Sequence, residues 1–202
     1  MPPLKAHAAL LILTLALALD SAVYAQKGRP ATSYAQAVGL PLQVIVVFGD
    51  QYNGGDELYD AKITVAEIVR GEKAWQKVRA AGAGNMPQAS GLEYLLARVR
   101  FEFSARAQPH HYDYTLAPAQ FSAMSAAAAP YASADLAAPV KPELRGVLHS
   151  GGSVEGWVAF LIPRGDHTPL MVFREDVGSV IHQGDASIFK LYDENPAAKT
   201  KP

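Results

Sequence analysis

The chain has 202 residues, half of them hydrophobic, which is enough apolar material for one sizeable core, so we expect a single domain. Its 18 basic and 19 acidic residues give a formal net charge of -1, and the absence of a basic tract argues against nucleic acid as a partner. The sequence contains no cysteine, so disulfides, thiolate metal sites, cysteine nucleophiles and a lipobox cysteine are excluded.

Residues 1–25 have the features of a secretory signal segment. Lys5 supplies the early positive charge, and residues 8–19 form an apolar run that is too short to span a bilayer. Val23-Tyr24-Ala25 fits a small-x-small cleavage site, which would make Gln26 the first residue of the mature protein. We therefore expect a secreted or periplasmic protein with no stable membrane span in its mature form, and an uncleaved anchor is the alternative.

The rest of the chain indicates short strands separated by turns. Residues 26–40 are polar and rich in alanine and glycine, which predicts a flexible N-terminal arm, and residues 193–202 predict a disordered tail. Between them, residues 41–192 contain strand patterns at 42–48, 59–70, 92–106, 121–125, 154–162, 170–173 and 187–192. Residues 71–81 could form one or two helical turns. Residues 126–142 are rich in alanine and proline and predict a loop with at most one short strand.

Two of these strands have the clearest patterns. Along residues 92–106 one face is apolar, from Leu95 to Phe103, and the other is polar, as in an antiparallel sheet with one wet face. In the strand at 59–70 the alternation slips near Ala66, which indicates either a bulge or the end of the strand. These patterns predict an all-β fold, an immunoglobulin-like antiparallel β-sandwich with at most one short helix.

The stretch at 146–163 contains the most apolar strand of the chain. A Gly/Ser turn precedes it, and Pro163, which has no N–H to donate, ends it. Both of its faces are mostly apolar, so we expect it to be covered on both sides. Gly156 leaves room for a close approach of Trp157 or of a neighbouring backbone, and we interpret Trp157 as a core residue.

Several motifs together resemble a known family. They are Arg70-Gly71-Glu72-Lys73-Ala74-Trp75, Asn85-Met86-Pro87, Gly91-Leu92-Glu93-Tyr94 and Gly151-Gly152-Ser153-Val154-Glu155-Gly156-Trp157. In order and spacing they resemble the telokin-like, immunoglobulin-like domain of unknown function of bacterial secreted proteins and lipoproteins, a group related to a mycobacterial secreted antigen. The resemblance covers residues 41–192 and implies a β-sandwich, a signal segment or lipid anchor, and no catalytic residues to carry over. This chain departs from many such proteins because it lacks the lipidated cysteine.

Two groups of residues are candidate metal sites. The acidic turn after residue 48, with Asp50, Asn53, Gly54, Gly55, Asp56 and Glu57, offers oxygen ligands for calcium, but its spacing does not match a calcium loop, so a solvated turn is favoured. Zinc could be bound by His110, His111 and Asp113, joined by His149, His167 or His182. Adjacent histidines on a strand point to opposite faces, so surface histidines are favoured.

The sequence gives less support to a catalytic site or a ligand groove than to a metal site. His149-Ser150-Gly151-Gly152-Ser153 lacks the Gly-x-Ser-x-Gly spacing of a serine nucleophile, and no acid partner is evident. Trp75 and Trp157 could line a ligand groove. We therefore expect no enzyme and no cofactor, but a non-catalytic module of the bacterial cell envelope that binds an unknown protein or glycan. The alternative is a metal-binding protein or metal-dependent enzyme that uses the acidic turn or the histidines.

Overall fold

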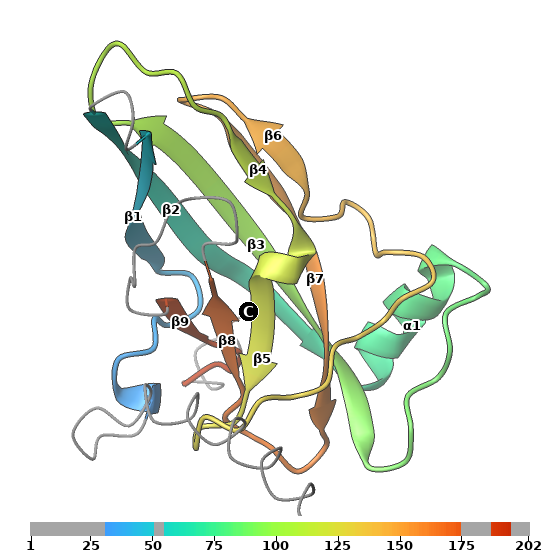
Figure 1. Ribbon diagram of the computed structural model, residues 1–202. Helices are drawn as coiled ribbons and strands as arrows, with labels where there is room; N and C mark the ends of the chain where they lie inside the picture. The colour runs from blue at the N-terminus through green and yellow to red at the C-terminus, as the bar shows by residue number, and fades with distance from the viewer. Residues whose placement is uncertain (1–30, 51–54, 175–186, 195–202) are drawn as a thin grey trace, which may run out of the picture.

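A computed structural model describes residues 31–50, 55–174 and 187–194 of the chain (Figure 1). The predicted all-β antiparallel sandwich is confirmed, with one α-helix among these residues. The predicted signal segment 1–25, the start of the arm and the tail beyond residue 194 lie outside the described residues, and their predictions stand untested. Residues 31–40 of the predicted arm lie against the last strand, where Gln36 exchanges backbone hydrogen bonds of 2.8 Å with Ile188 and Lys190.

The larger sheet has four antiparallel strands in the order β1-β2-β3-β7. Its strands are β1 (Pro41–Asp50), β2 (Gly55–Arg70), β3 (Leu92–Ala105) and β7 (Ser153–Pro163). Because β1 and β7 stand at the two ends of this order, they are the edge strands of the sheet. The predicted bulge is confirmed, because the register of β2 on β3 shifts between Val65 and Glu67.

Five shorter strands complete the fold. A three-stranded sheet has the order β5-β8-β9, and a separate pair is formed by β4 and β6. Their bounds are Tyr114–Leu116 for β4, Phe121–Met124 for β5, Gly146–Leu148 for β6, Leu170–Phe173 for β8 and Ser187–Lys190 for β9. Single 3-10 turns occur at Ala31–Ser33 and Pro118–Gln120. The sequence pattern missed β4 and β6, because three residues are too few to show an alternation.

The core lies between the two larger sheets, as Figure 1 shows with β5 and β8 in front of β3. The inward side chains of β3 from Leu95 to Phe103 are buried, which confirms their predicted face. Phe101 packs on Phe173 of β8 with ring centroids 5.8 Å apart, so the aromatic rings join one sheet to the other. On the outward face Arg98 and Arg100 are exposed, which confirms the wet face along that part of β3.

Near Tyr94, Leu96 and Trp157 the outward face of the sheet is covered by α1 (Glu72–Ala81), which is longer than the one or two turns expected. Its Ala74 and Val78 are buried against Tyr94, Leu96 and Trp157. Residues of two motifs from the sequence analysis, 70–75 and 91–94, meet at this contact between α1 and the sheet. Gly71 has a φ of 65°, a conformation that favours glycine, and its N–H donates to the Tyr94 C=O at 2.9 Å. Trp75 stacks on Tyr94 with centroids 5.8 Å apart. The motifs thus form the joint between helix and sheet.

Candidate functional site

The described part of the acidic turn forms an internal network. The Glu57 carboxylate accepts hydrogen bonds from the Tyr59 O–H at 2.6 Å and from the His111 N–H at 2.8 Å, and it also pairs with the His111 ring. These bonds, that of Tyr59 first, lower the pKa of Glu57 from 4.5 to about 2. Glu57 therefore ties β2 to the segment before β4. Asn53, Gly54 and the side chain of Asp50 lie outside the described residues.

The histidines pair with carboxylates one by one and do not converge. His149 Nδ1 lies 2.7 Å from Asp113 Oδ1, while His111 pairs with Glu57. His110 packs edge-on to the Tyr59 ring, and His167 is exposed in a turn. No group of three or more histidine or acidic residues that could hold a metal ion occurs in the described ranges, and His182 lies outside them. This geometry gives the metal alternative no support.

Ser150 has a backbone role in the turn before β7. Its hydroxyl oxygen accepts a hydrogen bond of 2.9 Å from the Ala105 N–H. The same turn pairs with Phe103, which accepts from the Gly151 N–H at 2.8 Å and donates to the Gly152 C=O at 2.9 Å. Asp113 is the acid partner of His149 that the sequence did not nominate. The two residues are exposed and form a surface pair beside this turn.

Gly156 and Trp157 form a structural unit, as predicted. A Cβ at Gly156 would lie 2.4 Å from Leu144 N and 2.6 Å from the Glu143 oxygen, so a neighbouring backbone fills the space that glycine leaves. Trp157 is only 8% exposed and packs under α1, with Lys77 Nζ 4.9 Å from the ring centre. Trp157 also lines a cavity.

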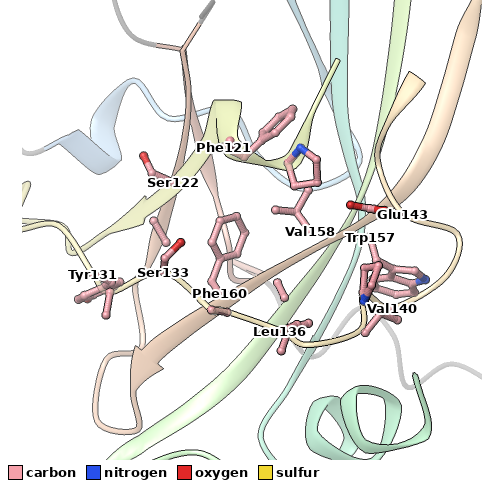
Figure 2. A pocket seen from close by; sticks show the side chains of 17 residues that line it. Phe121, Ser122, Tyr131, Ser133, Leu136, Val140, Glu143, Trp157, Val158 and Phe160 are labelled. Atoms are coloured by element: carbon pink, nitrogen blue, oxygen red, sulfur yellow. The ribbon is translucent and has the colours of Figure 1, made fainter. Parts of the chain in front are cut away.

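That cavity, which we call the side cavity, lies along one side of the sandwich and has a volume of about 430 Å³. Its walls come from β5 and β7, which are edge strands of opposite sheets. Residues 130–143, which we call the strap, run from one edge to the other and close this side. Figure 2 shows side chains from β5, β7 and the strap around one hollow, with Tyr131 and Ser133 at one end and Glu143 and Trp157 at the other.

The strap is held at both ends by backbone hydrogen bonds. Near β5, the Tyr131 N–H donates to the Ala123 C=O at 2.9 Å. At β7, the Trp157 N–H donates to the Pro142 C=O at 2.7 Å, and a bridge joins Ser133 to Phe160. Between these two points the strap has many more residues than β7, so it cannot pair with the strand residue by residue there. The side cavity opens where the edge is not tightly paired.

Side-chain bonds fix the strap from outside. Asn85 is 6% exposed, and its amide bonds both backbone groups of Ala138, donating at 2.8 Å and accepting at 2.9 Å, while it also donates to the Val78 C=O at 2.7 Å. It therefore clamps the strap to the end of α1. At the other end, the Tyr131 hydroxyl donates to the Asp166 carboxylate. A strap held in this way gives the cavity a fixed wall.

Most of the lining side chains are apolar, but polar atoms make up a large part of the surface that faces the cavity. Aromatic rings of Phe121, Tyr131, Trp157 and Phe160 contribute, with Val158, Leu136 and Val140. Since backbone groups alternate along a strand, the Ala159 N–H faces the strap like that of Trp157. Glu143 is half-buried and forms ion pairs with Lys141 at 3.6 Å and with Arg145 at 3.2 Å, so its charge is balanced by cations. The site can therefore give a ligand both apolar contacts and polar partners.

Sequence reasoning missed the side cavity. Most of one wall is the alanine- and proline-rich segment that showed no periodicity. Tyr131, Leu136 and Val140 could have indicated a buried segment, because they are apolar side chains spaced along a stretch too rich in proline to form a helix. Their burial depends on the path of the strap over the two sheet edges. Trp75, the other tryptophan considered for a groove, packs on Tyr94.

The protein is thus an all-β sandwich with a cavity on one side, between two sheet edges and the strap. No family model matches the chain, and no match was found among curated proteins. The fold is similar to the secreted protein MPT63 of Mycobacterium tuberculosis, with 14% identity, a TM-score of 0.45 and coverage of 78% of this chain and 98% of that one. It is also similar to a candidate lipoprotein of Bacillus subtilis, with 12% identity and a TM-score of 0.45.

The B. subtilis alignment covers 64% of this chain, which spans only 35% of that protein's length. At this level of similarity neither neighbour carries an argument about function, and the family resemblance stays a prediction. Among the residues that the structure describes, no helix has the length and apolar character needed to cross a bilayer.

Proposed function

We propose that the protein is a secreted, non-catalytic binding module of the bacterial cell envelope, and that its ligand occupies the side cavity. One observation carries the proposal: the cavity of about 430 Å³ lies between two sheet edges under a strap that is anchored on both sides. Ligand sites commonly have volumes of about 300–1,000 Å³, apolar walls and few polar groups. The side cavity has a volume in this range and mostly apolar lining side chains, and polar atoms form a large part of its surface.

The lining suits a ligand with both apolar and polar parts. Aromatic rings supply large contact areas, and Ser133 and the edge N–H of Ala159 supply hydrogen-bonding groups within the same cavity. Because the carboxylate of Glu143 is already paired with two cations, it does not require a charged ligand. The ligand is therefore an uncharged group with apolar and polar parts, either a small molecule or a side group of an envelope protein or glycan.

The compartment rests on the sequence. The signal-like segment at residues 1–25 and the lack of cysteine support export without lipidation. The resemblance to a domain of secreted proteins and lipoproteins supports the same assignment. A binding role, as opposed to catalysis, is supported by the described acid–histidine pairs, which tie segments together and lie outside the cavity lining.

The test uses the uncharged fluorescent probe N-phenyl-1-naphthylamine, which reports apolar sites. The chain has two tryptophans, so Trp75→Phe leaves Trp157 in the cavity wall as the only indole. We expect the probe to bind and to accept excitation energy from Trp157. Ala159→Leu, which fills the cavity from β7, should weaken probe binding by about tenfold, a change of about 1.4 kcal/mol.

The matched control is Ala127→Leu, which makes the same change at an exposed alanine outside the cavity lining and should leave probe binding unaltered. Equal binding by the two variants would place the probe elsewhere and refute the assignment of the site. Native mass spectrometry of the protein purified from its own envelope would then identify the natural ligand. A bound mass that Ala159→Leu removes and Ala127→Leu keeps is the expected result.

A further inference from the structure

The edge strand β1 lies at the opposite side of the four-stranded sheet from the side cavity. The hydrogen bond from the Arg106 N–H to the Leu58 C=O, at 3.0 Å, sets the phase of the sheet. Because backbone groups alternate, the even-numbered residues at the start of β2 bond to β3, and the odd-numbered ones bond to β1. Tyr59 is opposite Val46 in this register, so the even-numbered residues of β1 bond to β2. The odd-numbered residues of β1 therefore point their backbone groups outward.

These outward groups belong to Gln43, Ile45 and Val47, and no described segment pairs with this edge. At the start of the strand the edge is closed, because the Gln36 amide donates to the Pro41 C=O at 2.7 Å. The edge available for pairing thus begins after Pro41. The opposite edge of the same sheet, β7, is covered by the strap.

The β1 edge lacks the features that usually prevent strand pairing between molecules. Such features are charged side chains, prolines and bulges. Residues 41–49 carry no charged side chain, and the one charged residue and the one proline of β1, Asp50 and Pro41, stand at its two ends. The register of β1 on β2 runs without a shift from Pro41 to Asp50. An extended partner strand could therefore add along the edge without distortion.

An apolar patch on the outward face adjoins this edge. Ile45 is 51% exposed, and Leu58 on β2 is 42% exposed. Val47 is half-buried and stands directly opposite Leu58 in the register, so the three side chains are neighbours. This patch and the outward backbone groups lie at the same place. A partner that pairs with the edge would also cover the patch.

We propose that the β1 edge pairs with β1 of a second copy of this chain, antiparallel and centred on Ile45. In that arrangement Ile45 faces the partner's Ile45, and Gln43 faces the partner's Val47. Each such pair exchanges two backbone hydrogen bonds. A two-fold axis perpendicular to the sheet keeps the patches of both copies on one face, where they merge into a single apolar surface. The absence of charge along residues 41–49 means that self-pairing brings no like charges together.

The test measures the self-association of the mature protein by sedimentation velocity over a wide concentration range. Wild-type protein should show a reversible monomer–dimer equilibrium. Ile45→Lys puts like charges directly opposite each other across the axis and should raise the dimer dissociation constant at least tenfold. Ser104→Lys is the matched control, because it adds the same charge at an exposed position on the central strand β3 and should leave the constant unchanged.

A charge-pair experiment separates pairing at this edge from any effect on folding. Ile45→Glu alone should also be monomeric, but mixing it with Ile45→Lys should restore dimers that contain one copy of each. Three results would overturn the proposal: a wild-type protein that stays monomeric at the highest concentration, equal dissociation constants for Ile45→Lys and Ser104→Lys, or no association in the mixture. The cavity test above is unaffected by any of these results, because β1 does not line the cavity.

Discussion

Gly156→Ala tests how tightly the strap's anchor is packed against β7. The new methyl group would lie 2.4 Å from Leu144 N, 2.5 Å from Glu143 C and 2.6 Å from Glu143 O. All three are backbone atoms, so no side chain can turn away to make room. The end of the strap and Leu144 after it would have to move. Two hydrogen bonds oppose this movement: the Trp157 N–H donates to the Pro142 C=O at 2.7 Å, and the Leu144 N–H donates to the Trp157 C=O at 3.3 Å.

The expected loss of stability follows from these contacts. Overpacking a core site costs about 1–3 kcal/mol. Each of the two strap hydrogen bonds contributes about 1 kcal/mol if the movement breaks it. The free energy of unfolding should therefore fall by about 3–5 kcal/mol. Leu144 is fully buried beside this contact, which limits how far the strap can shift without opening the core.

Urea denaturation followed by tryptophan fluorescence measures the loss. The matched control is Gly146→Ala in β6, since a Cβ there meets nothing within 4 Å. Its free energy of unfolding should stay within about 0.5 kcal/mol of the wild-type value, as for most substitutions away from packed features. If both alanine variants unfold at the same urea concentration, the reasoning that Gly156 is required by the backbone of residues 143 and 144 is wrong.

Three further predictions concern packing, the strap and pH. Phe101→Ala should reduce the free energy of unfolding by about 3–5 kcal/mol, as for an emptied aromatic core site, whereas Arg100→Ala on the exposed face should cost well under about 1 kcal/mol; equal urea midpoints would show that the faces are assigned wrongly. Asn85→Ala leaves buried backbone groups of the strap and helix unpaired, so it should cost about 1–3 kcal/mol and increase amide hydrogen exchange at residues 137–139, and unchanged exchange there would contradict the clamp. Glu57 has its pKa lowered from 4.5 to about 2, so its contribution to stability is complete above pH 4.5 and is lost as the pH falls towards 2. Glu57→Gln should flatten that part of the stability profile, and an identical acid limb in the variant would argue against the network.

The sequence by itself determined the features that depend on local periodicity. The alternation from Leu95 to Phe103 identified both the strand and its buried face, because successive side chains on a strand point to opposite sides. The slip at Ala66 located the bulge for the same reason. Gly156 indicated a close approach of another backbone, because glycine in an apolar strand often leaves room for a neighbouring chain segment.

Tertiary structure alone decided which distant segments meet. The pairing of Asp113 with His149 and of Glu57 with His111 depends on contacts across 36 and 54 residues, which no local pattern records. Asn85 was part of a family-like motif, but its role as a clamp needs Ala138, which lies 53 residues away. The side cavity has the same origin, because its walls are edge strands of two sheets and a strap without periodicity. A cavity is a property of how elements are placed together, so it appeared only when the chain was folded.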